Sequence, residues 1–187
     1  MKMKLMIASD IHGSAYYCSL LMSAYEREKP DKLLLLGDIL YHGPRNDLPR
    51  DYDPKKVIAM LNSIADNIIC IRGNCDTQVD QMVLDFDIMA EYAYIFADGV
   101  TFFASHGHVY NKSCPPKTKG VVLLNGHTHV PEYGVYDSFT YVNCGSVSIP
   151  KESTPHTYMI FTERCLYWKD LSGECCRKEY LPKREAE

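Results

Sequence analysis

The sequence predicts an α/β protein, a mixed β-sandwich with helices packed outside it, formed by a single domain over residues 1–187. Up to about residue 90, short apolar runs alternate with segments of helical period, a pattern typical of parallel βαβ units. Beyond that point the pattern is mostly that of β-strands. The chain has no internal repeat, low-complexity segment or linker, and its length suffices for one sizeable core.

The chain begins with a predicted strand, helix and strand. The apolar run Lys4–Ala8 leads directly into the polar turn Ser9–Gly13. Ser14 suits an N-cap, apolar residues follow at helical spacing, and the helix should end just before Pro30, which cannot continue it. The continuous apolar run at residues 32–36 then indicates a strand covered on both faces. This order predicts a right-handed βαβ unit in a parallel sheet.

A second helix and a third strand are predicted after a loop at residues 41–52 that is dense in Gly, Pro, Asn and Asp. Asp53 and Pro54 suit the N-cap and the first position of this helix. Its inner face is predicted to carry four apolar residues at helical spacing, namely Val57, Ile58, Leu61 and Ile64. Residues 67–71 form the next apolar run and lead into a turn at residues 72–74.

The second half of the chain begins with a predicted hairpin. Strands at residues 92–96 and 100–105 flank Asp98-Gly99, a strong signal for a type I′ turn. Further strands are expected at residues 121–124, 135–136, 140–142, 157–161 and 165–168, and Cys175-Cys176 is expected on opposite faces of another. The charged tail at residues 183–187 is expected to fray.

Composition excludes several classes of protein. The formal net charge is −4 and there is no Lys/Arg run, which argues against a dedicated binder of long nucleic acid. No stretch approaches the roughly 18 apolar residues of a membrane span, and Asp10 interrupts the first apolar run too early for a secretory signal. We therefore expect a cytoplasmic protein. Its eight cysteines include no Cys-x-x-Cys pair, so reduced thiols are expected, with Cys18 and Cys70 buried.

Polar side chains follow five of the predicted strands. They are Asp10-x-His12, Gly37-Asp38, Gly73-Asn74, His106 and His127-x-His129. Residues two apart on extended backbone point to the same side, so each Asp-x-His or His-x-His pair should aim at one point. A single Asp-x-His is more often a polar turn after a buried strand, but five such strand ends can meet along one sheet edge. Oxygen and imidazole ligands together suit Mn²⁺, Zn²⁺ or Fe²⁺.

These strand ends offer seven ligands, which are too many for one tetrahedral ion. They suit two ions bridged by one carboxylate, the arrangement that clamps both oxygens of an in-line displacement at phosphorus. Two dications and two carboxylates leave a net charge of about +2, which a bridging hydroxide lowers to about +1. Such a centre should attract a phosphate anion.

The ordered set of motifs resembles that of the calcineurin-like metallophosphoesterases over nearly the whole chain. The matching fragments are Asp10-x-His12, Gly37-Asp38, Gly73-Asn74, His106 and Gly126-His127-x-His129. Two longer stretches, residues 37–46 and 72–76, are similar to those of small bacterial YfcE-type phosphodiesterases. The resemblance implies a four-layer αββα sandwich, in which two mixed sheets are flanked by helices.

The same resemblance implies the metal ligands and the mechanism. It assigns Asp10, His12 and His129 to one ion, Asn74, His106 and His127 to a second, and Asp38 to a bridge between them. It also implies attack of a metal-activated hydroxide on phosphorus. Mn²⁺ is the first choice for both ions, with Zn²⁺, Fe²⁺, Ni²⁺, Co²⁺ and Mg²⁺ as alternatives.

Four residues are candidates for catalysis: Asn74, Cys75, His106 and His108. Cys75 stands where many metallophosphoesterases have a histidine that stabilises the transition state or protonates the leaving group. Its presence favours diesters with good leaving groups over monoesters. His108 either contacts substrate or is an ordinary surface histidine.

Neighbouring residues are open to more than one interpretation. His42, Arg45 and Asn46 either bind a phosphate or nucleoside part or belong to a loop held by its own turns or by an oligomer contact. Asp76 either orients a ligand histidine or caps a helix. Residues 143–146 are interpreted as a turn that supports the site without direct chemistry.

The predicted function is therefore hydrolysis of a small phosphodiester by a binuclear metal centre. The main alternative is a non-catalytic scaffold, for which the retromer subunit that shares this fold, with part of its ligand set lost, is the precedent. A nuclease is disfavoured because the chain lacks a basic surface and has no room for a DNA-binding domain. A homo-oligomer is compatible with the sequence.

Overall fold

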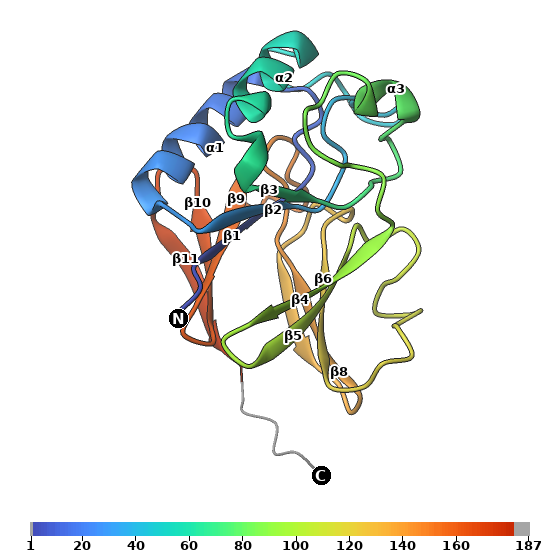
Figure 1. The fold of residues 1–187 in the computed structure, drawn as a ribbon, viewed down its shortest axis with the longest axis vertical. Coiled ribbons are helices and arrows are strands. Elements are labelled where there is room, and N and C mark those ends of the chain that lie inside the picture. The colour runs from blue at the N-terminus through green and yellow to red at the C-terminus, as the bar shows by residue number, and fades with distance from the viewer. Residues whose placement is uncertain (1, 182–187) are drawn as a thin grey trace.

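The computed structural model describes residues 2–181, which form two mixed β-sheets facing one another (Figure 1). The first sheet has the order β11-β10-β9-β1-β2-β3, with β1 at Leu5–Ala8, β2 at Lys32–Leu35, β3 at Ile68–Cys70, β9 at Thr157–Thr162, β10 at Cys165–Asp170 and β11 at Cys175–Tyr180. The second has the order β4-β5-β6-β8-β7, with β4 at Tyr92–Ala97, β5 at Val100–Ser105, β6 at Val121–Asn125, β7 at Glu132–Val135 and β8 at Phe139–Asn143. Two mixed β-sheets with helices confirm the predicted class. The expected fourth layer differs, because the helices at Ala15–Glu28 and Pro54–Asn62 cover the first sheet and no helix within residues 2–181 covers the far face of the second.

Helices α1 (Ala15–Glu28) and α2 (Pro54–Asn62) lie on one side of the first sheet, where β1, β2 and β3 run parallel (Figure 1). The Ser14 hydroxyl accepts a hydrogen bond from the N–H of Tyr17, which confirms the predicted N-cap of α1. Asp53 caps α2 in the same way. The predicted inner face of α2 was wrong at Ile64, because the helix ends at Asn62 and Ile64 packs from the following turn.

The second sheet begins with the β4–β5 hairpin. Asp98 and Gly99 both have positive φ, 47° and 70°, as a type I′ turn requires. The strand predicted at residues 135–136 was wrong in its bounds, because β7 ends at Val135. The N–H of Tyr136 instead donates to the carbonyl of Phe139 and closes the turn into β8.

The core has two layers because the continuous apolar strands are covered on both faces. Met6 and Ala8 of β1 pack toward the helices, whereas Leu5 and Ile7 pack against the second sheet. The far face of the second sheet carries a smaller cluster of Phe103, Val121, Leu123, Phe139 and Tyr141, against which Tyr110 of the loop after β5 packs. Alternate residues of one strand therefore build two separate cores.

The eight cysteines are free thiols in the structure, as expected. Cys18 and Cys70 are buried as predicted. Cys175 and Cys176 lie in β11 at the edge of the first sheet. The tail at residues 183–187 lies outside the described residues. None of the helices within residues 2–181 has both the length and the apolar character that crossing a bilayer requires.

A buried carboxylate joins the end of α1 to the first sheet. The side chain of Glu28 is 8% exposed and accepts hydrogen bonds from Lys169 Nζ at 2.5 Å, Lys4 Nζ at 2.9 Å and Tyr158 Oη at 3.0 Å. Burial alone would raise the pKa of this carboxyl, but the hydrogen bonds from Lys169, Lys4 and Tyr158 outweigh it and lower the pKa to about 2.

Glu28→Gln should therefore destabilise the protein at neutral pH by about 1–3 kcal/mol, because two lysines lose their buried counter-charge. A carboxyl whose pKa falls on folding contributes stability above its unfolded pKa of about 4.5, and that contribution is lost as pH falls toward 2. Urea unfolding at pH 7 and pH 3 measures this, with the exposed Glu26→Gln on the same helix as control. A wild-type advantage over Glu28→Gln that is as large at pH 3 as at pH 7 would contradict the assignment.

Candidate metal centre

All seven predicted ligand residues lie just beyond the carboxyl ends of β1, β2, β3, β5 and β6, at one edge of the sandwich. Asp10 and His12 follow β1, Asp38 follows β2 and Asn74 follows β3; His106 follows β5, and His127 and His129 follow β6. Both sheets contribute, so the site lies where their edges meet. The prediction that these strand ends converge is confirmed.

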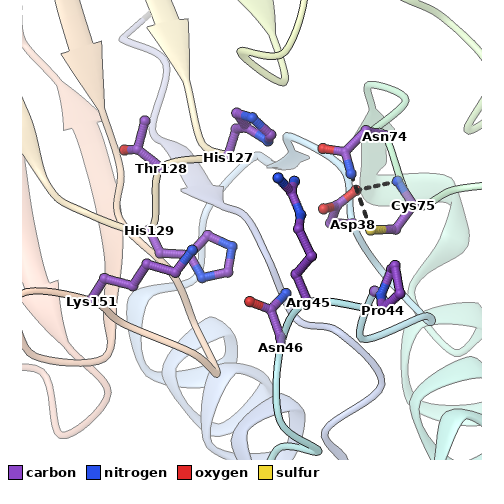
Figure 2. A pocket seen from close by; sticks show the side chains of 11 residues that line it. Asp38, Pro44, Arg45, Asn46, Asn74, Cys75, His127, Thr128, His129 and Lys151 are labelled. Atoms are coloured by element: carbon purple, nitrogen blue, oxygen red, sulfur yellow. Dashed lines mark hydrogen bonds between the residues drawn. The ribbon is translucent and has the colours of Figure 1, made fainter.

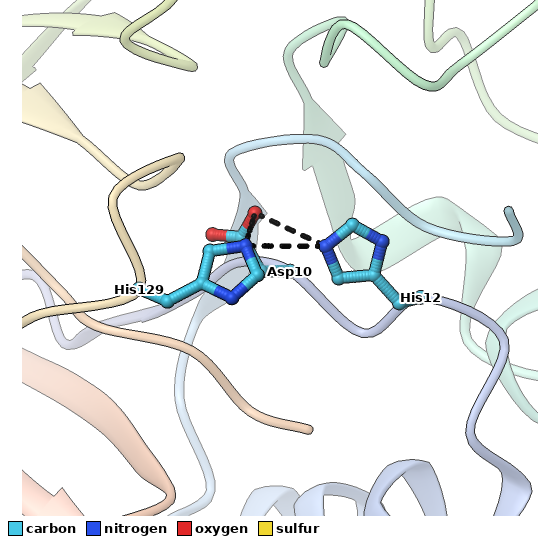
Figure 3. Close-up of side chains that lie close together, drawn as sticks. All are labelled: Asp10, His12 and His129. Atoms are coloured by element: carbon cyan, nitrogen blue, oxygen red, sulfur yellow. Dashed lines mark hydrogen bonds and ion pairs between the residues drawn. The ribbon is translucent and has the colours of Figure 1, made fainter. Parts of the chain in front are cut away.

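Asp10, His12 and His129 form the first group of ligand atoms (Figure 3). Asp10 Oδ1 lies 3.2 Å from His129 Nε2 and 3.6 Å from His12 Nε2, and the two imidazole nitrogens are 3.3 Å apart. All three side chains are buried. Three donor atoms thus surround one point between β1 and β6.

Asp38, Asn74, His106 and His127 form the second group. His106 Nε2 lies at its centre, 3.4 Å from Asp38 Oδ2, 3.1 Å from Asn74 Oδ1 and 3.2 Å from His127 Nδ1. Asp38 Oδ2 is also 3.8 Å from His12 Nε2, so this carboxylate reaches toward both groups.

These groups fit divalent cations. Two ligand atoms bound to one ion at about 2.0–2.2 Å are roughly 3.0–3.5 Å apart, close to the separations found within each group. Asp10 Oδ1 is fully buried and has no hydrogen-bond partner among the described residues. Such an orphaned acceptor facing two imidazole nitrogens needs a cation to compensate its burial.

Three of the histidines are held by backbone carbonyl groups. Nδ1 of His12 lies 2.8 Å from the carbonyl oxygen of Tyr41, and Nδ1 of His106 lies 2.7 Å from that of Leu36. Nδ1 of His129 lies 2.6 Å from the carbonyl oxygen of Ile149. Each carbonyl requires the proton on Nδ1, so Nε2 presents its lone pair to the centre, which is the usual arrangement for metal-ligating histidines.

The backbone explanation for these side-chain directions was wrong. The pairs were expected on extended backbone, but five ligand residues have positive φ: Asp10 59°, His12 49°, Asp38 55°, His127 66° and His129 63°. This left-handed region costs free energy for residues other than glycine and is concentrated at functional sites. Each of these five ligands therefore stands on a sharp turn after its strand, and not on the strand itself.

Close backbone approach explains two of the glycines in the motifs. A Cβ on Gly73 would lie 2.1 Å from Asp38 Oδ1, and a Cβ on Gly126 would lie 2.0 Å from Ser9 Oγ and 2.7 Å from Asp10 Oδ2. Any side chain at either position would therefore displace a ligand carboxylate.

Electrostatics at the centre favour positive charge. Burial opposes ionisation of Asp10, but His12 and His129 outweigh it and hold the pKa of Asp10 well below its usual range. Burial also disfavours the charged form of His106, but the carboxylates of Asp38 and Asp10 raise its pKa to about 9. Burial and the nearby His106 lower the pKa of His127 to about 4. The two carboxylates thus favour positive charge on the His106 imidazole, and a bound cation could supply that positive charge instead.

Asp76 has a different role from either of those expected. It is buried, and its carboxylate accepts hydrogen bonds from the N–H groups of Asp38 at 2.8 Å, Ile39 at 2.9 Å and Gly73 at 2.7 Å. It neither touches a ligand histidine nor caps a helix, since Thr77 is the N-cap of α3 (Gln78–Gln81). Asp76 ties together the two turns that carry Asp38 and Asn74.

The turn at residues 143–146 supports the site as predicted. The hydroxyl groups of Ser146 and Ser148 both donate to the backbone carbonyl of Asp10 at 3.0 Å. The Asn143 amide donates to the carbonyl of Gly126 at 2.6 Å. These bonds hold two ligand turns in place without any of the three side chains joining the donor groups.

The remaining candidates surround the centre. Cys75 Sγ, His12 and Asp38 form a third compact group of donor atoms, and burial together with the Asp38 charge raises the pKa of the thiol. Although β5 ends at Ser105, the exposed His108 ring lies 5.4 Å from that of His106. Arg45 and Asn46 line the adjoining pocket. So does Lys151, which sequence reasoning missed because no local motif marks it.

A two-sheet sandwich with carboxylate, imidazole and amide groups gathered at the strand ends defines a metal-dependent hydrolase. Comparison with known families agrees: residues 3–164 match the model of the calcineurin-like phosphoesterase superfamily domain. The chain belongs to this superfamily.

Individual relatives support the same assignment. The chain is 42% identical over 157 residues to phosphodiesterase YfcE of Escherichia coli K12, covering 83% of this chain and 85% of that protein. The solved structure of YfcE, a phosphoesterase from E. coli, superposes with a TM-score of 0.92 at 37% identity and covers 96% of this chain and all of that one. Vacuolar protein sorting 29 from Cryptosporidium parvum shares the fold, with a TM-score of 0.63 at 17% identity over 97% and 99% of the two chains.

Proposed function

We propose that this protein is a metal-dependent phosphodiesterase that hydrolyses small phosphodiesters. The observation that carries the proposal is the convergence of all seven ligand-type residues on one sheet edge beside an open pocket. The 42% identity to a protein named phosphodiesterase YfcE supports the reaction class. We further propose that residues 1–187 act as one domain in the cytoplasm.

The distances within the site support two divalent ions, with Mn²⁺ as the first choice. Asp10, His12 and His129 would hold one ion; Asn74, His106 and His127 would hold the other; Asp38 would bridge them. When bound, the ions supply an activated water nucleophile and positive charge for the phosphoryl oxygens.

The chain's own groups orient the reaction. The backbone carbonyls of Tyr41, Leu36 and Ile149 hold the imidazole protons away from the centre and fix the direction of the ring lone pairs. His108 is exposed beside His106 and His127, where it can donate a hydrogen bond to a phosphoryl oxygen. A phosphodiester can approach the ligand groups from the pocket side, because Asp10 and His12 are buried and Asp38, Asn74, His127 and His129 line the pocket.

Metal-dependent turnover of bis-p-nitrophenyl phosphate tests this function. The protein loaded with Mn²⁺ should hydrolyse the diester with a higher kcat/KM than p-nitrophenyl phosphate, and chelation should abolish both activities. Absence of turnover with Mn²⁺, Ni²⁺, Co²⁺, Zn²⁺ and Mg²⁺ would instead favour a non-catalytic scaffold. That outcome is relevant because vacuolar protein sorting 29 has the same fold.

Cys75→His should extend the reaction to poorer leaving groups. A p-nitrophenolate departs without protonation, whereas an alkoxide needs a proton donor, and imidazolium donates more readily than a thiol whose pKa is raised. We expect turnover of an alkyl phosphodiester, relative to the p-nitrophenyl diester, to rise by about 10²-fold in this variant. Cys75→Ala is the control and should show no such gain. If Cys75→Ala abolished diester turnover while its metal content stayed at the wild-type level, a cysteine nucleophile would replace this assignment.

A further inference from the structure

A pocket of about 390 Å³ adjoins the metal centre (Figure 2). Its floor is formed by Asp38, Asn74, His127 and His129 from the ligand turns. Its rim comes from two other loops, one at residues 43–46 and one that contributes Lys151. A phosphodiester has two ester arms, so one arm and the phosphate can lie over the ligand groups while the other arm extends along this rim.

Arg45 projects into the pocket from the loop after β2, and its guanidinium group points toward Asp38 and His127 (Figure 2). Hydrogen bonds hold residues 41–46 of this loop near both ends. The Asn46 amide donates to the carbonyl of His42 at 2.8 Å, and the carbonyl of the preceding Tyr41 lies 2.8 Å from His12 Nδ1. The position of Arg45 is therefore coupled to a ligand histidine through a short, hydrogen-bonded segment.

Lys151 enters the pocket from the opposite rim, beside His129 (Figure 2). The backbone N–H of Lys151 donates to the backbone carbonyl of His129 at 3.2 Å, and the backbone carbonyl of Lys151 accepts from the Thr154 hydroxyl at 2.7 Å. The lysine is thus joined directly to a ligand residue. Two cations from separate loops flank one opening.

Neither cation is neutralised by the protein. No hydrogen bond or ion pair engages the Arg45 guanidinium or the Lys151 ammonium within residues 2–181. Among the residues that line the pocket, Asp38 is the only acidic one, and it belongs to the ligand groups. The lining also contains no Phe, Tyr or Trp, so it offers no aromatic platform on which a nucleobase could stack.

These observations show more positive charge than a simple diester requires. A phosphodiester carries one negative charge, which two divalent ions and two ligand carboxylates already compensate. Arg45 and Lys151 are exposed and add two further positive charges on the rim, where an anionic ester arm could pair with both.

We propose that Arg45 and Lys151 form an anion subsite that selects phosphodiesters whose second ester arm carries a carboxylate or a phosphate. The subsite rests on the proposed phosphodiesterase function and specifies its substrate class. Arg45 would contact the carboxylate or phosphate of this arm through paired N–H donors. Lys151 would contact the same anionic group from the other rim as a point charge.

A series of p-nitrophenyl diesters with one constant leaving group tests the subsite. The varied arm is carboxymethyl (anionic), ethyl (neutral) or choline (cationic), so the chemistry at phosphorus stays the same. We expect kcat/KM to decrease in that order, with about a 30-fold to 100-fold difference between the first and the last. The preference should shrink as ionic strength rises, because exposed charges are screened.

Arg45→Gln and Lys151→Gln should each lower the carboxymethyl-to-choline ratio of kcat/KM by about threefold to tenfold, and the double variant should bring it close to one. Lys119→Gln, an exposed lysine before β6 at the end remote from the site, is the matched control and should keep the wild-type ratio. A wild-type ratio near one, a ratio unchanged in both variants, or an equal loss on all three substrates would overturn the subsite.

Failure of the subsite can be separated from failure of the proposed function. If the ethyl diester is hydrolysed but arm charge has no effect, the phosphodiesterase assignment stands and the subsite does not. If no diester is hydrolysed, calorimetric titration of the Mn²⁺-loaded protein with the carboxymethyl and choline diesters tests the subsite alone. Tighter binding of the carboxymethyl diester, lost in the double variant, supports it; equal binding of the two overturns it.

Discussion

Asp38→Asn is expected to lower turnover of bis-p-nitrophenyl phosphate by about 10³-fold, the larger of two effects that follow from the site. Asp38 Oδ2 lies 3.4 Å from His106 Nε2 and 3.8 Å from His12 Nε2, so one carboxylate serves both groups of ligands. An amide keeps the shape of the side chain but removes its negative charge. Elemental analysis and calorimetry of the purified variant should therefore show weakened binding of both ions.

Two comparisons make this result specific. His129→Ala removes a ligand from the first group alone and should lower the occupancy of mainly one ion. Asp137→Asn carries the same substitution at an exposed position and should leave metal content and turnover as in the wild type. Two ions bound to Asp38→Asn with wild-type affinity, together with normal turnover, would show that Asp38 does not bridge.

Asp76→Asn is expected to cost about 2–4 kcal/mol of unfolding free energy and roughly 10-fold to 100-fold in metal affinity. The Asp76 carboxylate accepts three backbone N–H hydrogen bonds, from Asp38, Ile39 and Gly73. An amide has only one acceptor oxygen, so its NH₂ group must face at least one of these N–H donors. Thermal unfolding should show the loss as a decrease in Tm of about 4–16 °C.

The matched control is Asp80→Asn, four residues along the chain. Asp80 accepts hydrogen bonds from Thr77 in the capping box of α3, so its loss should cost about 1 kcal/mol and leave the metal centre intact. If Asp76→Asn lowered stability without weakening metal binding, Asp76 would be a structural residue of the fold alone. If both variants behaved alike, the link between the two ligand turns would be wrong.

The anion subsite and the metal centre depend on the same turns. The carbonyl of Tyr41, in the loop that carries Arg45, is hydrogen-bonded to His12 Nδ1. The backbone N–H of Lys151 donates to the carbonyl of His129. The loops that carry selectivity are therefore built directly on the residues proposed to hold the ions. This arrangement allows the loops to differ between related proteins while the strand ends keep one chemistry.

The sequence by itself determined which residues meet at the site and in what order the main elements come. Strand ends with polar residues can be identified from local signals, because an apolar run followed by Gly-Asp or Gly-Asn is visible in a few consecutive positions. The cap of α1 at Ser14 and the turn at Asp98-Gly99 are equally local, and the structure confirms both. Each of these features depends on residues that are close neighbours in the chain.

Only the tertiary structure decided how the site is held. Asp10 and His129 have positive φ, and both are hydrogen-bonded through their backbone to segments distant in the chain, Asp10 to Gly37 and His129 to Lys151. The Asp76 carboxylate accepts a hydrogen bond from a residue 38 positions away. The backbone N–H of Lys151 donates to the carbonyl of His129, which holds Lys151 beside the pocket. Glu28 likewise meets Lys169 only after α1 lies on the first sheet. Buried polar partners are selected by the three-dimensional packing, because a buried carboxylate needs donors from whichever segments surround it.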